Sequence, residues 1–194
     1  EAGHEPTGQG WMHTMTQCSY AGGSGAGGGG GGGGQSSRPR LPKGTDKNAI
    51  KDFNERFDAA LKRLEDPNSD CAKLFGGKDK AINALQNASY SYQNLGMGKV
   101  DQDGRLHVTG AATFGNTVFI NTFGPFRNPT ILVQTVSGVR PQTANQGLNN
   151  PVDVGALILL HELGHLLGIF KPDANNSELN QAQTQQVIDA CFKE

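Results

Sequence analysis

The chain has 194 residues and a formal net charge of −1 at pH 7. This length is enough for one domain with a sizeable core. The balanced charge gives no indication of binding to nucleic acid or to an anionic membrane surface. The longest apolar run, residues 154–160, is too short to cross a bilayer. We therefore expect no nucleic-acid partner and no membrane span.

Residues 1–44 do not have the composition of a folded domain. Most of residues 21–34 are glycine, which offers no side chain to bury and loses the most backbone entropy on ordering. We expect residues 1–44 to form a disordered, glycine-rich arm or linker, and residues 45–194 to form the folded domain. His4, His13 and Cys18 lie in the arm at spacings that match no standard metal site.

A glycine-rich tether before a folded module suggests a longer chain. The layout resembles the C-terminal module of larger surface or secreted proteins, including polymorphic-toxin and Rhs-type chains. The sequence also begins with Glu and shows no signal peptide. This resemblance implies an upstream domain and a secreted or extracytoplasmic location.

Three segments have helical periodicity. Residues 45–66 carry apolar side chains at steps of three and four, with Thr45 or Asp46 as the cap. A short segment, Cys71–Gly77, precedes a second helix near Lys78–Ala88. A last helix over about Glu178–Cys191 begins after Ser177, and its predicted apolar side comprises Leu179, Val187, Ile188 and Cys191.

Between these helices, residues 89–149 have the composition of strands and loops. Runs rich in β-branched and aromatic residues predict strands at Leu106–Thr109, Thr117–Asn121 and Thr130–Val136. Helices flanking a strand-rich middle indicate an α+β domain.

The chemically informative stretch is His-Glu-Leu-Gly-His-Leu-Leu-Gly, residues 161–168. On a helix, His161 and His165 lie one turn apart and point the same way, so they can hold one Zn²⁺. Glu162 lies about 100° round the turn, where it can take a proton from a water whose pKa the zinc lowers to about 7. Asn150 and Pro151 predict the start of this helix, and Gly168 predicts its end.

This segment resembles the active-site helix of the zincin metallopeptidases, and its H-E-x-x-H-x-x-G form resembles the metzincins in particular. The resemblance implies a zinc-dependent endopeptidase, a hydrolase of peptide or protein substrates, in a small zincin-like domain. Such a domain has a short mixed sheet, a buried active-site helix and a C-terminal helix. The edge strand of the sheet pairs with substrate, and Thr117–Asn121 is our prediction for that strand.

The third zinc ligand departs from the metzincin pattern. Metzincins place a His or Asp three residues after the glycine, where this chain has Lys171, and a protonated lysine has no lone pair for a metal. We favour Asp173, with Glu178 as the alternative that would make the site gluzincin-like. Asp173 can also be read as a turn residue, and His107 as a third ligand from a strand.

The predicted roles follow from these positions. His161, His165 and Asp173 bind Zn²⁺, and Glu162 acts as general base and then as proton donor to the leaving amine. Tyr90 and Tyr92 are conceivable donors to the oxyanion. Two alternatives remain: a zinc hydrolase of a non-peptide amide, and a catalytically inactive metal-binding or interaction module. Lys171 at the usual ligand position keeps the second alternative open.

Cys71 and Cys191 are the two cysteines of the predicted domain. They can form a disulfide that ties the last helix to the helical N-terminal half, or remain a buried thiol pair. The disulfide is favoured if the protein is extracytoplasmic.

Overall fold

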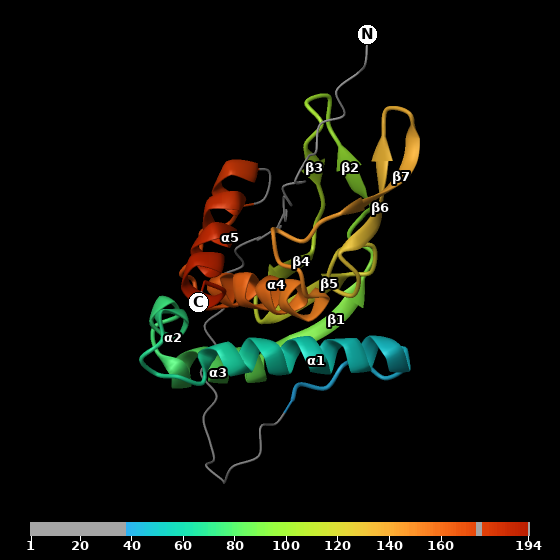
Figure 1. Ribbon diagram of the computed structural model, residues 1–194. Coiled ribbons are helices and arrows are strands. Elements are labelled where there is room, and N and C mark those ends of the chain that lie inside the picture. The colour runs from blue at the N-terminus through green and yellow to red at the C-terminus, as the bar shows by residue number, and fades with distance from the viewer. Residues whose placement is uncertain (1–37, 174–175, 194) are drawn as a thin grey trace.

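The structure is a computed structural model that describes residues 38–173 and 176–193. The helices are α1 (Lys47–Leu64), α2 (Asp70–Leu74), α3 (Lys78–Asn87), α4 (Pro151–Leu166) and α5 (Ser177–Cys191). The strands are β1 (Ser89–Gln93), β2 (Gly98–Val100), β3 (Leu106–His107), β4 (Ala111–Phe114), β5 (Thr117–Asn121), β6 (Thr130–Thr135) and β7 (Gly138–Thr143). Figure 1 shows α1 beneath α4, α5 to one side, and the β6–β7 hairpin projecting from the other. The predicted α+β class is confirmed.

Two small mixed sheets lie between the helices. One has the order β1-β5-β4, with β1 parallel and β4 antiparallel to β5. The other has the order β3-β2-β6-β7, in which only β2 and β6 are parallel. Thr117–Asn121 is therefore a central strand, and its prediction as the edge strand is wrong. Both flanks of β5 are paired within the domain, and the edge that contacts α4 is β4.

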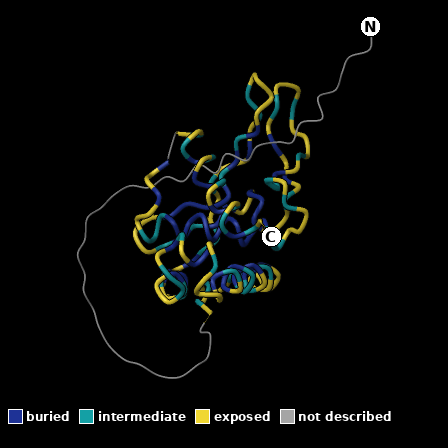
Figure 2. The backbone as a smooth tube through the Cα atoms, turned by 60° about the vertical axis from the view of Figure 1, so that its left-hand side comes forward, coloured by how far each residue is buried: buried dark blue, intermediate teal, exposed yellow. Residues whose placement is uncertain are grey.

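The core lies where α1 and α4 meet the three-stranded sheet. Every residue from Val154 to Gly164 is buried, so α4 is enclosed on all sides, as its continuous apolar sequence predicts. Phe53 of α1 packs on Tyr90 of β1, with ring centroids 5.0 Å apart. Figure 2 shows the buried segments gathered in the middle of the molecule. The H-E-x-x-H motif is thus carried by a helix that is enclosed on all sides.

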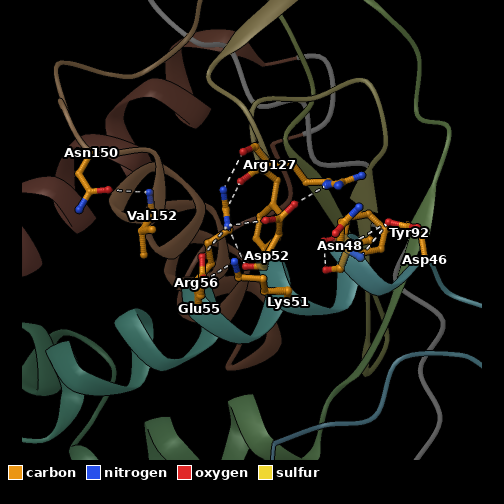
Figure 3. Close-up of polar contacts among 12 residues, drawn as sticks. Asp46, Asn48, Lys51, Asp52, Glu55, Arg56, Tyr92, Arg127, Asn150 and Val152 are labelled. Carbon is orange, nitrogen blue, oxygen red and sulfur yellow. Dashed lines mark hydrogen bonds and ion pairs between the residues drawn. The ribbon is translucent and has the colours of Figure 1, made fainter.

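A buried arginine fixes α1 against α4 and the loop after β5. Arg56 donates to the carbonyl oxygens of Phe126 and Arg127, at 2.5 and 2.7 Å. A Cβ on Gly155 would lie 2.4 Å from Cδ of Arg56, so the glycine of α4 makes room for this side chain. Arg127 in turn donates to Asp52 of α1 at 2.7 Å (Figure 3).

The C-terminal helix is anchored at its far end. Cys71 of α2 and Cys191 of α5 form a disulfide across a sequence separation of 120 residues. Arg63 of α1 donates to the carbonyl oxygen of Cys191 at 2.5 Å and to Asp153 of α4 at 3.0 Å. These contacts hold the end of α5 against α1, α2 and α4.

Most of the predicted glycine-rich arm, residues 1–37, lies outside the described residues. Its last residues contact α1, where Arg38 donates to Asp58 at 2.7 Å. Within residues 38–173 and 176–193, no helix combines the length and the apolar character needed to cross a membrane.

Candidate metal centre

Helix α4 presents the two motif histidines on one face. The side chain of Asn150 caps the helix by accepting from the backbone N–H of Val152 at 2.9 Å, and Pro151 occupies the first turn. His161 and His165 lie one turn apart, and their Nε2 atoms are 3.1 Å from one another. Both side chains are 2% exposed. Two imidazole nitrogens therefore converge on one point, as the spacing predicted.

The chain turns back sharply after α4. Gly168 adopts a φ of +66°, and the backbone N–H groups of Ile169 and Phe170 both donate to the carbonyl of Gly164, at 2.9 and 3.0 Å. The ring of Phe170 packs directly on Gly164, where a Cβ would lie 2.1 Å from Cδ2 of the ring. This close approach directs the following residues, 171–173, beneath the histidines.

Asp173 completes a three-residue group. Its Oδ2 lies 3.3 Å from Nε2 of His161 and 3.6 Å from Nε2 of His165. Burial raises the pKa of Asp173, but its contacts with the two histidines outweigh that effect and lower the pKa to about 2. The carboxylate is therefore ionised at neutral pH. The buried group His161, His165 and Asp173 can hold a metal ion.

A further observation shows that this group suits a cation. Oδ1 of Asp173 is buried and has no hydrogen-bond partner among the described residues. An ionised, enclosed carboxylate oxygen without a donor is costly unless a cation offsets it. Two neutral imidazoles and one carboxylate form a donor set that transition metals bind.

Helix α5 lies behind the group and contacts it through polar side chains. Oγ1 of Thr184 lies 3.0 Å from Nδ1 of His161. Nδ2 of Asn180 donates to Oδ2 of Asp173 at 2.5 Å. Sequence reasoning missed both residues, because it placed the apolar side chains of α5 on the buried side.

The carboxylate of Glu162 contacts β4. It is 0% exposed, and its Oε2 accepts a hydrogen bond from Oγ1 of Thr113 at 2.6 Å. Thr113 was also missed from the sequence, where nothing in Ala-Ala-Thr-Phe distinguishes it from any strand threonine. The buried carboxylate that directly follows His161 in the sequence is thus tied to the edge of the three-stranded sheet.

The other candidate ligands lie elsewhere. Glu178 is exposed in the first turn of α5 and does not belong to the group of possible ligands. His107 on β3 contacts Asp101 at 2.8 Å and is not part of the group either. Lys171 is exposed, and its carbonyl accepts from Gln183 at 3.1 Å. Asp173 is therefore the carboxylate that the structure brings to the histidines.

The two tyrosines considered as oxyanion donors are engaged with backbone. The hydroxyl of Tyr90 donates to the carbonyl of Leu85 at 2.8 Å, and that of Tyr92 donates to the carbonyl of Ala49 at 3.1 Å. Each hydroxyl is thus already used in a hydrogen bond to a backbone carbonyl. His4, His13 and Cys18 lie outside the described residues.

Comparison with protein-family models, with curated proteins and with solved structures finds no significant match to this chain. The function must therefore be argued from the site itself.

Proposed function

We propose that this chain is a zinc-dependent endopeptidase in which His161, His165 and Asp173 bind the metal. One observation carries the proposal: the three ligand atoms lie 3.1, 3.3 and 3.6 Å from one another. A tetrahedral zinc ion with bonds of about 2.0–2.1 Å separates its ligands by about 3.3 Å. The group therefore has the size of one face of a zinc tetrahedron.

The spacing favours zinc over the main rival for this donor set. Two histidines and one carboxylate also bind non-haem Fe²⁺, usually with octahedral geometry. Ligands at right angles at similar bond lengths lie about 3.0 Å apart, which is shorter than all three separations here. Glu162 directly after the first histidine is the arrangement in which a carboxylate acts on a metal-activated water.

The number of ligands favours catalysis over a structural role. Structural zinc sites have four protein ligands, whereas catalytic sites have three and leave a position for water. Across residues 38–173 and 176–193, the group comprises three residues, His161, His165 and Asp173. When bound there, zinc would supply a Lewis acid and a water of lowered pKa.

The other steps belong to side chains of the protein. Glu162 accepts the proton of the attacking water and then delivers it to the leaving amine. Thr113 holds one oxygen of Glu162 and thereby sets the direction of the carboxylate. Strand β4 carries Thr113 and forms an edge of the sheet, so it replaces β5 as our candidate for pairing with an extended peptide.

The disulfide provides information on the compartment in which the protein resides. A bridge between Cys71 and Cys191 persists in an oxidising compartment, which supports a secreted or extracytoplasmic protein. We retain the proposal that the chain is the C-terminal module of a larger secreted or toxin-like protein, with the upstream domain delivering it to peptide or protein substrates.

One observation favours a second candidate, a metal-binding module without catalysis. Glu162 is 0% exposed, and His161 and Asp173 are 1% and 0% exposed. A peptide must reach these groups before it can be cleaved, whereas a structural metal site needs no such access.

Replacing the general base separates the two candidates. Glu162→Gln keeps the shape of the side chain and leaves the three ligands intact, so the variant should bind one zinc per chain and lose hydrolysis of a peptide library. Zinc content and turnover would be measured for both proteins. Turnover equal to that of the wild type would refute Glu162 as base, and a zinc-loaded wild type that cleaves nothing would favour the non-catalytic module.

A further inference from the structure

The buried face of α5 is polar where it meets the metal group. Its buried residues recur at steps of three and four along the helix and comprise Asn180, Gln183, Thr184, Val187 and Cys191. A helix normally buries an apolar stripe, because buried polar groups destabilise the fold unless they are hydrogen-bonded. The burial of these polar side chains therefore needs a physical explanation.

Each polar side chain of the stripe contacts the metal group or the segment that leads to it. Thr184 faces His161, Asn180 faces Asp173, and Gln183 donates to the backbone carbonyl of Lys171. Two of the three proposed ligands, His161 and Asp173, are thus contacted from the same helix.

The contact of Thr184 fixes the tautomer of the His161 ring. Nε2 of His161 faces the convergence point, so it must offer its lone pair there and the ring proton must reside on Nδ1. Oγ1 of Thr184 lies 3.0 Å from Nδ1 and can accept that proton in a hydrogen bond. This hydrogen bond selects the tautomer and sets the ring orientation that a metal ligand needs.

The contact of Asn180 fixes the carboxylate. Its amide donates to Oδ2 of Asp173, the oxygen nearest both histidines. Asp173 follows the exposed residues Lys171 and Pro172, which belong to no helix or strand, so no regular element fixes where the carboxylate points. The amide supplies that constraint, and Gln183 adds a second one through Lys171.

We propose that Thr184 and Asn180 are positioning residues of the metal centre, Thr184 for the His161 imidazole and Asn180 for the Asp173 carboxylate. The proposal rests on the proposed function, since it requires a metal at this site. It goes further by assigning a role to α5, whose residues lie outside the H-E-x-x-H motif. Outer-shell partners of this kind typically change metal affinity by about 10- to 100-fold when removed.

Metal binding to the full chain tests the assignment. Thr184→Val keeps the side-chain shape and removes the hydroxyl, and Thr184→Ser keeps the hydroxyl. Competition with a chelator should show Zn²⁺ affinity lowered about 10- to 100-fold in Thr184→Val and restored to within about threefold in Thr184→Ser. Thr143→Val, a threonine-to-valine change on the surface strand β7, should leave the affinity unchanged.

Absorption of the Co²⁺-loaded protein provides a readout that a loss of packing alone would not move. Thr184→Val should shift the visible cobalt bands, and Thr184→Ser should return them to the wild-type positions. Asn180→Ala tests the second contact independently and keeps the test decisive if Thr184→Val does not fold. It should lower Zn²⁺ affinity by a similar factor.

The outcomes separate the inference from the function on which it rests. If the wild type binds Zn²⁺ tightly and both Thr184→Val and Asn180→Ala bind it equally well with unchanged cobalt spectra, the role of α5 is refuted and the zinc site stands. If the wild type itself binds neither Zn²⁺ nor Co²⁺, the metal centre is refuted and the role of α5 with it.

Discussion

The hydroxyl of Thr113 on β4 donates a hydrogen bond of 2.6 Å to Oε2 of Glu162 on α4. The two residues are 4% and 0% exposed, so the contact is shielded from water. It joins the edge of the three-stranded sheet to the carboxylate that we propose as general base. The direction of Glu162 therefore depends on β4 as well as on its own helix.

Removing this hydroxyl should impair catalysis without affecting the metal. Thr113→Val removes one hydrogen bond to the carboxylate of Glu162, worth about 1.5–3 kcal/mol, and part of that loss should appear as a roughly tenfold lower kcat. Zinc affinity should stay within about twofold, because Thr113 contacts none of the three ligands. Thr113→Ser, which keeps the donor, is the matched control. A kcat unchanged in Thr113→Val would show that the contact does not orient the base.

The third ligand is tested by two carboxylate replacements. Asp173→Asn keeps the side-chain volume but removes the charge, and it should weaken Zn²⁺ binding by more than about 100-fold, since two histidines alone neither complete the shell nor offset its charge. Glu178→Gln makes the same chemical change on an exposed residue of α5 and should have little effect. Chelator competition on both variants would decide, and the reverse order of affinities would assign the role to Glu178.

Gly164 should be intolerant of a methyl group. Alanine favours a helix by about 1 kcal/mol over glycine, but its Cβ would lie 2.1 Å from the Phe170 ring, and overpacking of a core costs about 1–3 kcal/mol. We expect Gly164→Ala to lower the free energy of unfolding and to weaken Zn²⁺ binding, because Phe170 leads the chain to Asp173.

A double-mutant cycle isolates that clash. In a Phe170→Val background the ring is gone, so the same Gly164→Ala change should be less destabilising than in the wild type. Denaturant unfolding of the wild type, the two single variants and the double variant gives the coupling free energy between positions 164 and 170. Equal effects in both backgrounds would mean that the ring of Phe170 is not what excludes a side chain at Gly164.

The disulfide should contribute substantially to stability. Cys71 and Cys191 are 120 residues apart, and the chain-entropy model assigns about 4.7 kcal/mol to a loop of about this size, although typical measured values are about 2–4 kcal/mol. The double variant Cys71→Ser, Cys191→Ser should lose free energy of unfolding in that measured range. It should also bind Zn²⁺ more weakly, because α5 carries Asn180 and Thr184. A non-reduced digest with two free thiols would contradict the bridge itself.

Local signals predicted the helix that carries the H-E-x-x-H motif well. Asn150, Pro151 and Gly168 are residues whose backbone preferences mark helix ends regardless of tertiary context, and α4 runs from Pro151 to Leu166 between them. The two histidines follow from the helical repeat. Asp173 was harder, because its position depends on how Phe170 packs against Gly164, which no spacing rule describes.

The remaining parts of the site depend on tertiary structure. The run Thr117–Asn121 was recognised as a strand, but strand order in a sheet is decided by pairing between distant segments, so its central place was not predicted. On α5, counting apolar residues correctly selected Val187 and Cys191 and also selected Leu179 and Ile188, which are half-buried. It did not select Asn180 and Thr184, which the helix buries. A polar stripe is buried only because it faces another polar site, and that site becomes visible only after folding.

The central claim is tested most directly by titrating metal-free protein with Zn²⁺ while following cleavage of a peptide library. The proposed three-ligand site predicts that cleavage rises in proportion to added Zn²⁺ and levels off at one ion per chain. It also predicts that metal-free protein cleaves nothing and that Glu162→Gln stays inactive at every ratio. Binding of one Zn²⁺ per chain with no cleavage by the wild type at any ratio would contradict a peptidase and leave a non-catalytic metal site.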